Sequence, residues 1–61
     1  MTGPELTSAR KTLGLSVTAL AEALRLGPNG STAIREMERG KRYISGPVQV
    51  AVELMLEAHN D

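Results

Sequence analysis

The pattern of apolar and polar residues predicts two short helices joined by a turn between residues 16 and 42. The first helix begins after Ser16, whose hydroxyl can accept a hydrogen bond from a free amide of the first turn. Its apolar face has the spacing i, i+3, i+4 and i+7 and comprises Val17, Leu20, Ala21 and Leu24. Because Ala21 is small and central on this face, a neighbouring helix can approach closely.

A glycine-rich turn, expected at residues 25–30, leads into the second helix. This helix is expected to begin between residues 29 and 31 and to run to Arg39, where Gly40 can adopt the left-handed cap. We expect one face to pack and the opposite face to be exposed. The packed residues are Ala33, Ile34 and Met37, and the exposed stripe is Thr32, Arg35, Glu36 and Arg39.

The exposed stripe has the chemistry that base reading needs. An arginine matches the two acceptors of guanine, and a carboxylate can accept from the cytosine amine. The predicted base-reading residues are Ser31, Thr32, Arg35 and Glu36. The alternative is a solvated face on which Glu36 merely pairs with Arg39 at i, i+3.

Two further helices flank this pair. The N-terminal helix is expected to use Thr2 or Gly3 as its cap and Pro4 as its first residue, with Leu6, Ala9 and Leu13 on its apolar face. The last helix, at about residues 46–58, carries one apolar stripe of Val48, Ala51, Val52 and Met55 and a second of Val50, Leu54 and Ala58. We expect the second stripe to form a symmetric dimer interface, and the alternative is that both stripes are buried within the monomer.

The composition fits a single small domain of all-α class over residues 1–61. The distribution of charge fits a DNA-binding surface confined to one part of that domain. The net charge is zero, but residues 25–42 hold five basic residues against two acidic ones, whereas the full charges after residue 46 are all acidic. The chain is therefore expected to be a dipole with its positive pole at the helical pair. A core of this size is marginal without help, which oligomerisation would supply.

Catalysis and metal binding are not expected. His59 is the only histidine and there are no cysteines, so neither a nucleophile pair nor a metal site is predicted, and no cofactor or small-molecule ligand is evident. The glycines at 27–30 lack the lysine and strand of a P-loop. We also expect no signal peptide and no membrane segment, and hence a cytoplasmic protein.

The sequence resembles the Cro and lambda-repressor-type (xenobiotic response element-like) helix-turn-helix family over about residues 5–56. The residues that carry the resemblance are Leu13-Gly14-Leu15-Ser16, Leu20-Ala21-Glu22, Leu24, Ile34 and Glu38-Arg39-Gly40-Lys41. The resemblance implies a compact bundle of four or five helices whose motif, at about residues 16–40, places its second helix in the major groove. It also implies an ion pair between Arg10 and Glu38, the alternative being an exposed charge at Arg10.

The sequence departs from the family pattern in the longer turn at residues 26–30 and at two single positions. Val17 replaces the glutamine that often opens the first motif helix, which leaves the amides near Ser16 and Val17 as possible phosphate binders. Met37 replaces a tryptophan or leucine and can fill the same volume. The predicted phosphate-binding residues are Ser16, Val17, Asn29, Gly30, Arg39, Lys41, Arg42 and Tyr43. For Tyr43 the alternative is a ring packed against the last helix.

These features predict a sequence-specific DNA-binding regulator. The expected form is a homodimeric transcriptional repressor that binds a palindromic operator in double-stranded DNA, and autoregulation or association with phage, toxin-antitoxin or anti-defence genes is compatible with the family resemblance. The alternative is a protein-interaction module, or an antitoxin, whose apolar last helix binds a protein partner.

Overall fold

Four α-helices form the chain in the computed structural model, which describes residues 1–60. They are α1 (Gly3–Thr12), α2 (Val17–Ala23), α3 (Gly30–Glu38) and α4 (Gly46–Asn60), and the described residues contain no strand. Asp61, with which the predicted domain ends, lies outside the described residues. The all-α class is confirmed, and α4 continues past the predicted end at Ala58 to Asn60.

Local side chains set where α1 and α2 begin. The Thr2 hydroxyl accepts from the Glu5 amide at 3.2 Å and the Glu5 carboxylate accepts from the Thr2 amide at 2.7 Å, which is a reciprocal capping box. The Ser16 hydroxyl accepts from the Ala19 amide at 3.0 Å. The caps predicted at Thr2 and Ser16 are therefore confirmed.

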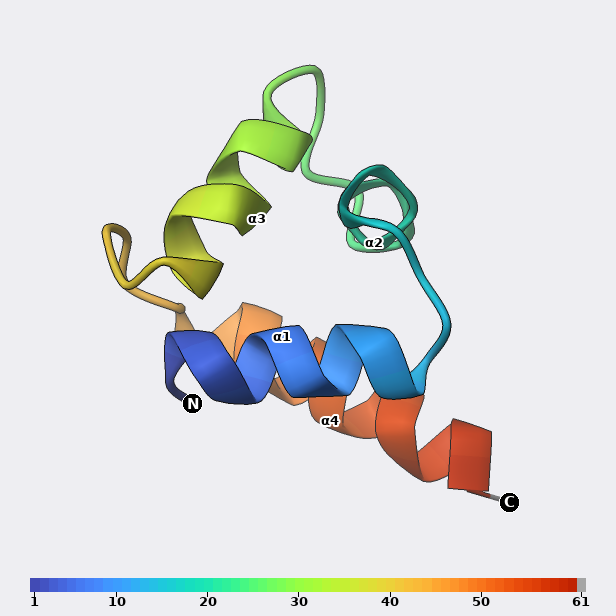
Figure 1. Cartoon of the computed structure of the whole chain (residues 1–61). Helices are drawn as coiled ribbons and strands as arrows, with labels where there is room; N and C mark the ends of the chain where they lie inside the picture. Colours follow the sequence, from blue (N-terminus) through green and yellow to red (C-terminus); the bar gives the residue numbers. More distant parts are fainter. Residues whose placement is uncertain (61) are drawn as a thin grey trace.

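Helix α1 packs against both α3 and α4, and α2 packs against α3 (Figure 1). Each helix contributes one fully buried side chain to the common core, namely Leu6, Leu20, Ile34 and Val52. Ile44, in the segment between α3 and α4, is buried against the same cluster. Most of the apolar residues that periodicity assigns to the interior thus meet in one core, but Leu13 and Ala51, which were also assigned to apolar faces, are not part of this cluster.

The α2–α3 crossing depends on a close approach at Gly30. A β-carbon built at Gly30 would lie 2.9 Å from the β-carbons of both Ala21 and Leu26, closer than real side chains pack. The turn reverses the chain through positive φ angles of 57° at Arg25 and 82° at Gly27. The first motif helix and the turn therefore have the predicted positions, and small Ala21 has the predicted role.

An ion pair joins α1 to the end of α3. Arg10 Nε donates to Glu38 Oε2 at 2.7 Å and Arg10 Nη2 donates to Glu38 Oε1 at 3.2 Å, while Nη1 donates to the Leu15 carbonyl at 3.1 Å. The two side chains are only 16% and 12% exposed, so Arg10 is not a free surface charge. The structure thus contains the pair that the family resemblance implies.

The pairing changes how Glu38 titrates. Burial raises the pKa of Glu38, but hydrogen bonding from Arg10 and Thr7 and the positive charges of Arg10 and Lys11 outweigh burial, so the pKa lies below its ordinary value of 4.5. Arg10 contributes more than Thr7, because the Thr7 hydroxyl donates to the Gly3 carbonyl at 3.2 Å. The ionised carboxylate therefore stabilises the folded state.

Substitution of Gly30 by alanine tests the close helix crossing. Gly30→Ala should lower the free energy of unfolding by about 1 to 3 kcal/mol, because the added methyl group overlaps two carbons that lie next to the backbone. Gly46→Ala is the control, since a β-carbon there meets nothing within 4 Å. Urea unfolding monitored by circular dichroism measures both variants, and equal stability of the two would refute the close approach.

The pH dependence of unfolding tests the ion pair. Because the folded-state pKa of Glu38 is lowered, its stabilisation is complete above the unfolded-state pKa and is lost as the pH falls through the folded-state pKa. Glu38→Gln should therefore destabilise the protein by about 2 kcal/mol at neutral pH, with a smaller difference from wild type at pH 3. Glu57→Gln, at an exposed position of α4, should not change the profile. A difference that stays constant with pH would contradict this assignment.

Candidate nucleic-acid interface

Helix α3 has one packed face and one exposed face, as its sequence predicts. Ile34 and Met37 are buried and Ala33 is half-buried, which anchors the helix on the core. The exposed side chains on the other face are Thr32, Arg35 and Arg39. The helix ends at the Arg39 cap, followed by Gly40 at a φ of 77°. Two predicted base-reading residues, Thr32 and Arg35, therefore lie on accessible surface.

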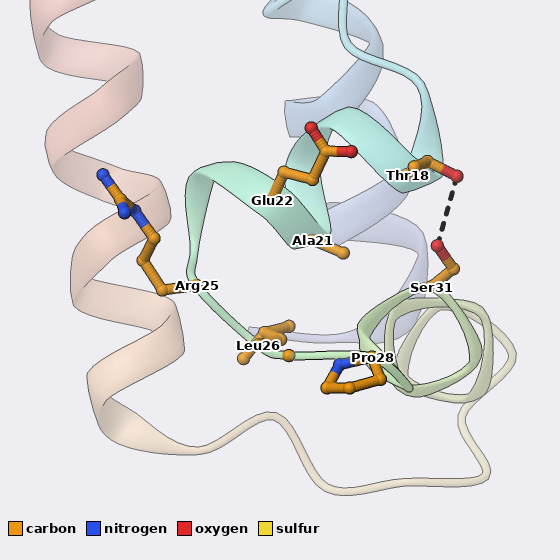
Figure 2. A pocket seen from close by; sticks show the side chains of 8 residues that line it. Thr18, Ala21, Glu22, Arg25, Leu26, Pro28 and Ser31 are labelled. Carbon is orange, nitrogen blue, oxygen red and sulfur yellow. Dashed lines mark hydrogen bonds between the residues drawn. The ribbon is translucent and has the colours of Figure 1, made fainter.

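Ser31 is placed differently from Thr32 and Arg35. It is half-buried, and its hydroxyl lies 3.1 Å from the Thr18 hydroxyl of α2, with which it shares a hydrogen bond (Figure 2). Thr18 was not among the predicted site residues, because helical spacing describes one helix and not the contact between two. Ser31 therefore links α2 and α3, and the predicted contact with a base would use the remaining hydrogen-bonding capacity of its hydroxyl.

Glu36 is also not freely displayed. Its Oε1 atom accepts from Arg42 Nε at 2.9 Å and from Arg42 Nη2 at 2.6 Å. The alternative pairing of Glu36 with Arg39 is not what the structure shows. Arg42 reaches Glu36 because the segment after α3 folds back, and the predicted contact of Glu36 with cytosine stays a prediction.

Lys41, Arg42 and Tyr43 form a basic corner after α3, and the backbone carbonyl of Glu36 fixes this corner to the helix. The amides of Lys41 and Arg42 both donate to the Glu36 carbonyl, at 2.8 and 3.2 Å. Both basic side chains are exposed, and Tyr43 is 86% exposed. The Tyr43 ring therefore does not pack on α4, and its hydroxyl is accessible. Together with Arg35 and Arg39, this corner makes a basic surface on and after α3.

The predicted backbone contacts of the turn are only partly available. Gly30 is buried and its amide donates to the Gly27 carbonyl at 3.0 Å, so its assignment as a phosphate binder is wrong. Asn29 caps α3 through its backbone, and its exposed side chain makes no capping hydrogen bond. The Ser16 hydroxyl accepts from Ala19 and the Val17 side chain packs against the core, and the predicted phosphate contact of the backbone amides near Ser16 and Val17 stays a prediction.

An open cleft of about 570 Å³ lies between α2, the turn and the start of α3 (Figure 2). Its apolar lining includes Ala21, Leu26 and Pro28, and Thr18 and Ser31 stand at one end. Its charged residues are Glu22 and Arg25, which the sequence analysis did not single out. The turn residues that line the cleft are those at positions 25–28, which join the end of α2 to the start of α3.

The two apolar stripes of α4 have different surroundings. Val52 is buried, and Val48 and Met55 pack partly against the core. Val50 and Leu54 are 54% and 58% exposed, and Ala58 is exposed as well. The alternative in which both stripes are buried in the monomer is therefore wrong, and the second stripe remains accessible.

Neither a metal site nor a membrane segment is found among residues 1–60. No group of at least 3 histidine, cysteine, aspartate or glutamate residues is placed to hold a metal ion there. No helix in this part of the chain has the length and apolar character needed to cross a membrane.

Comparison of the chain with family models, with curated proteins and with solved structures finds no match.

Proposed function

We propose that this chain is a sequence-specific DNA-binding regulator of the Cro and lambda-repressor type. In this proposal α2 and α3 form the helix-turn-helix, and α3 enters the major groove. The protein binds as a dimer to a palindromic operator in the cytoplasm and represses transcription by occupying a promoter. Autoregulation of its own operon is compatible with this proposal.

The observation that carries the proposal is the exposed basic face on and after α3. The buried side chains of Ile34 and Met37 anchor one face of α3 on the core, while Arg35 and Arg39 are exposed on the other face. The net charge of the whole chain is zero, so this basic surface is a local feature and not a consequence of a basic composition. A rigid helix with exposed hydroxyl and guanidinium groups is suited to reading base edges.

Each exposed side chain has a role in the proposal. Arg35 binds guanine through two donors and Thr32 contacts a neighbouring base edge, with Ser31 in a lesser part because its hydroxyl is shared with Thr18. Arg39, Lys41 and Tyr43 bind phosphates and fix the register of the helix on the duplex. The side chain of Asn29 is exposed at the start of α3 and is available for a further contact.

The proposed dimer forms through α4. The exposed stripe of Val50, Leu54 and Ala58 provides an apolar surface that a second copy covers by two-fold pairing. Such a dimer presents two copies of α3 to the two halves of a palindromic site. The same exposed stripe favours the second candidate function, a module in which α4 binds a protein partner such as a toxin.

Binding to an operator selected from random duplexes tests the DNA contacts. Lys41→Ala should weaken binding to all sequences by a similar factor and reduce the salt slope by roughly one per lost contact in each half-site. Arg35→Ala should instead relax preference at one operator position per half-site, with a loss of about 1 to 3 kcal/mol of discrimination.

Titrations at several salt concentrations, against a panel of single-base operator variants, separate these two outcomes. Lys11→Ala is a charge-matched control on α1 and should leave both properties unchanged. If the wild-type protein binds no duplex in a salt-dependent manner, the DNA-binding proposal is refuted. If Arg35→Ala lowers affinity equally for every operator variant, Arg35 is an electrostatic anchor and not a base reader.

Leu54→Glu tests the dimer. Because Leu54 is 58% exposed, the variant should fold as a monomer, and its charge should oppose pairing in a dry interface. Sedimentation equilibrium should show a wild-type dimer and a monomeric variant, which binds a two-half-site operator at least tenfold more weakly. His59→Glu places a carboxylate at an exposed position outside the stripe and should remain dimeric. A wild-type protein that is monomeric both free and on DNA would rule out the dimer.

A further inference from the structure

The Glu36–Arg42 pair fixes one edge of an arginine beside the exposed face of α3. Both hydrogen bonds to Glu36 Oε1, at 2.9 and 2.6 Å, come from the Nε and Nη2 atoms of Arg42. The backbone amide of Arg42 also donates to the Glu36 carbonyl at 3.2 Å. Arg42 is therefore tied to the same residue of α3 by its backbone and by its side chain.

The opposite edge of this guanidinium remains available. An arginine has five N–H donors, and the edge formed by Nη1 and the second Nη2 hydrogen can pair with two acceptors at once. Within residues 1–60 the structure gives this edge no hydrogen-bond partner. Acceptors in the matching geometry are two phosphate oxygens or the O6 and N7 atoms of guanine.

We propose that Glu36 is a positioning residue, which orients Arg42 so that its free edge makes a fixed contact with DNA beside α3. This inference rests on the proposed DNA-binding function. A positioned arginine loses less side-chain freedom when it binds, so it favours the one register in which both acceptors match its edge. The Glu36 carboxylate also repels phosphates in other registers. Both effects raise the ratio of specific to non-specific affinity.

Two substitutions separate positioning from charge. Glu36→Ala and Glu36→Gln remove the same negative charge, so both should bind a scrambled duplex several-fold more tightly than wild type. Only glutamine keeps an oxygen that can accept from Arg42. Glu36→Ala should therefore lower the ratio of operator to scrambled-duplex affinity about tenfold, whereas Glu36→Gln should retain most of it.

The double variant with Arg42→Ala tests whether Glu36 acts through Arg42. In that background, Glu36→Ala should change the specificity ratio no more than Glu36→Gln does, because no guanidinium is left to position and only the loss of the negative charge remains. Glu22→Ala, which removes an exposed carboxylate of α2, should leave the ratio unchanged. Single-base operator variants then identify the acceptor, since guanine recognition changes preference at one position and phosphate binding changes none.

The free protein gives an independent measurement. The Arg42 Nε–H signal in nitrogen-edited NMR should exchange with water more slowly in wild type and in Glu36→Gln than in Glu36→Ala. If the wild type binds its operator and both Glu36 variants shift the ratio equally, the carboxylate acts only as a charge and the positioning role is refuted. If the wild type binds no duplex, the proposed function fails first, and an intact Arg42 signal would show that the pair itself exists.

Discussion

The docking of both ends of α3 is the constraint on which the exposed surface depends. At its C-terminal end, Arg10 holds the Glu38 carboxylate, and a β-carbon at Gly3 would overlap the Glu38 carbonyl oxygen, so α1 touches both the side chain and the backbone. At its N-terminal end, Gly30 approaches Ala21 of α2 so closely that a methyl group would not fit. A helix fixed at both ends presents its outer face in a single orientation, which is what a base-reading contact of defined geometry requires.

The helices and their caps could be predicted from the sequence because they depend on residues close together in the chain. Thr2 and Ser16 hydrogen-bond to amides only three residues away, and the 3.6-residue period assigns Leu6, Leu20, Ile34 and Val52 to the interior. The exposure of the second α4 stripe could not be predicted in this way. Periodicity gives α4 two apolar stripes, but the packing of α4 against α1 and the common core decides which one the monomer buries.

The candidate site was less predictable, because its decisive contacts join segments whose geometry the sequence pattern does not specify. The hydrogen bond between Thr18 and Ser31 depends on how two helices cross, and the pairing of Glu36 with Arg42 depends on a chain reversal at Gly40. Gly30 is a case in which the sequence predicts a contact that the structure does not allow. A glycine at the start of a helix suggests an amide open to phosphate, but here Gly30 is buried and its amide donates to the Gly27 carbonyl.

The balance of charge bears on the proposed function, because it concerns how a domain with zero net charge could discriminate between DNA sequences. Non-specific affinity for DNA rises with the number of phosphates that basic side chains neutralise, so a protein with few free cations binds random sequence weakly. Arg10 and Arg42 are both engaged by carboxylates, which reduces the free positive charge without removing either side chain from its position. In the proposed complex, specific binding then depends on the geometry of a small number of hydrogen-bond donors that are fixed in position. In such a protein discrimination depends less on how much positive charge is present than on how firmly each guanidinium is held, which makes the acidic residues beside the arginines part of the proposed interface.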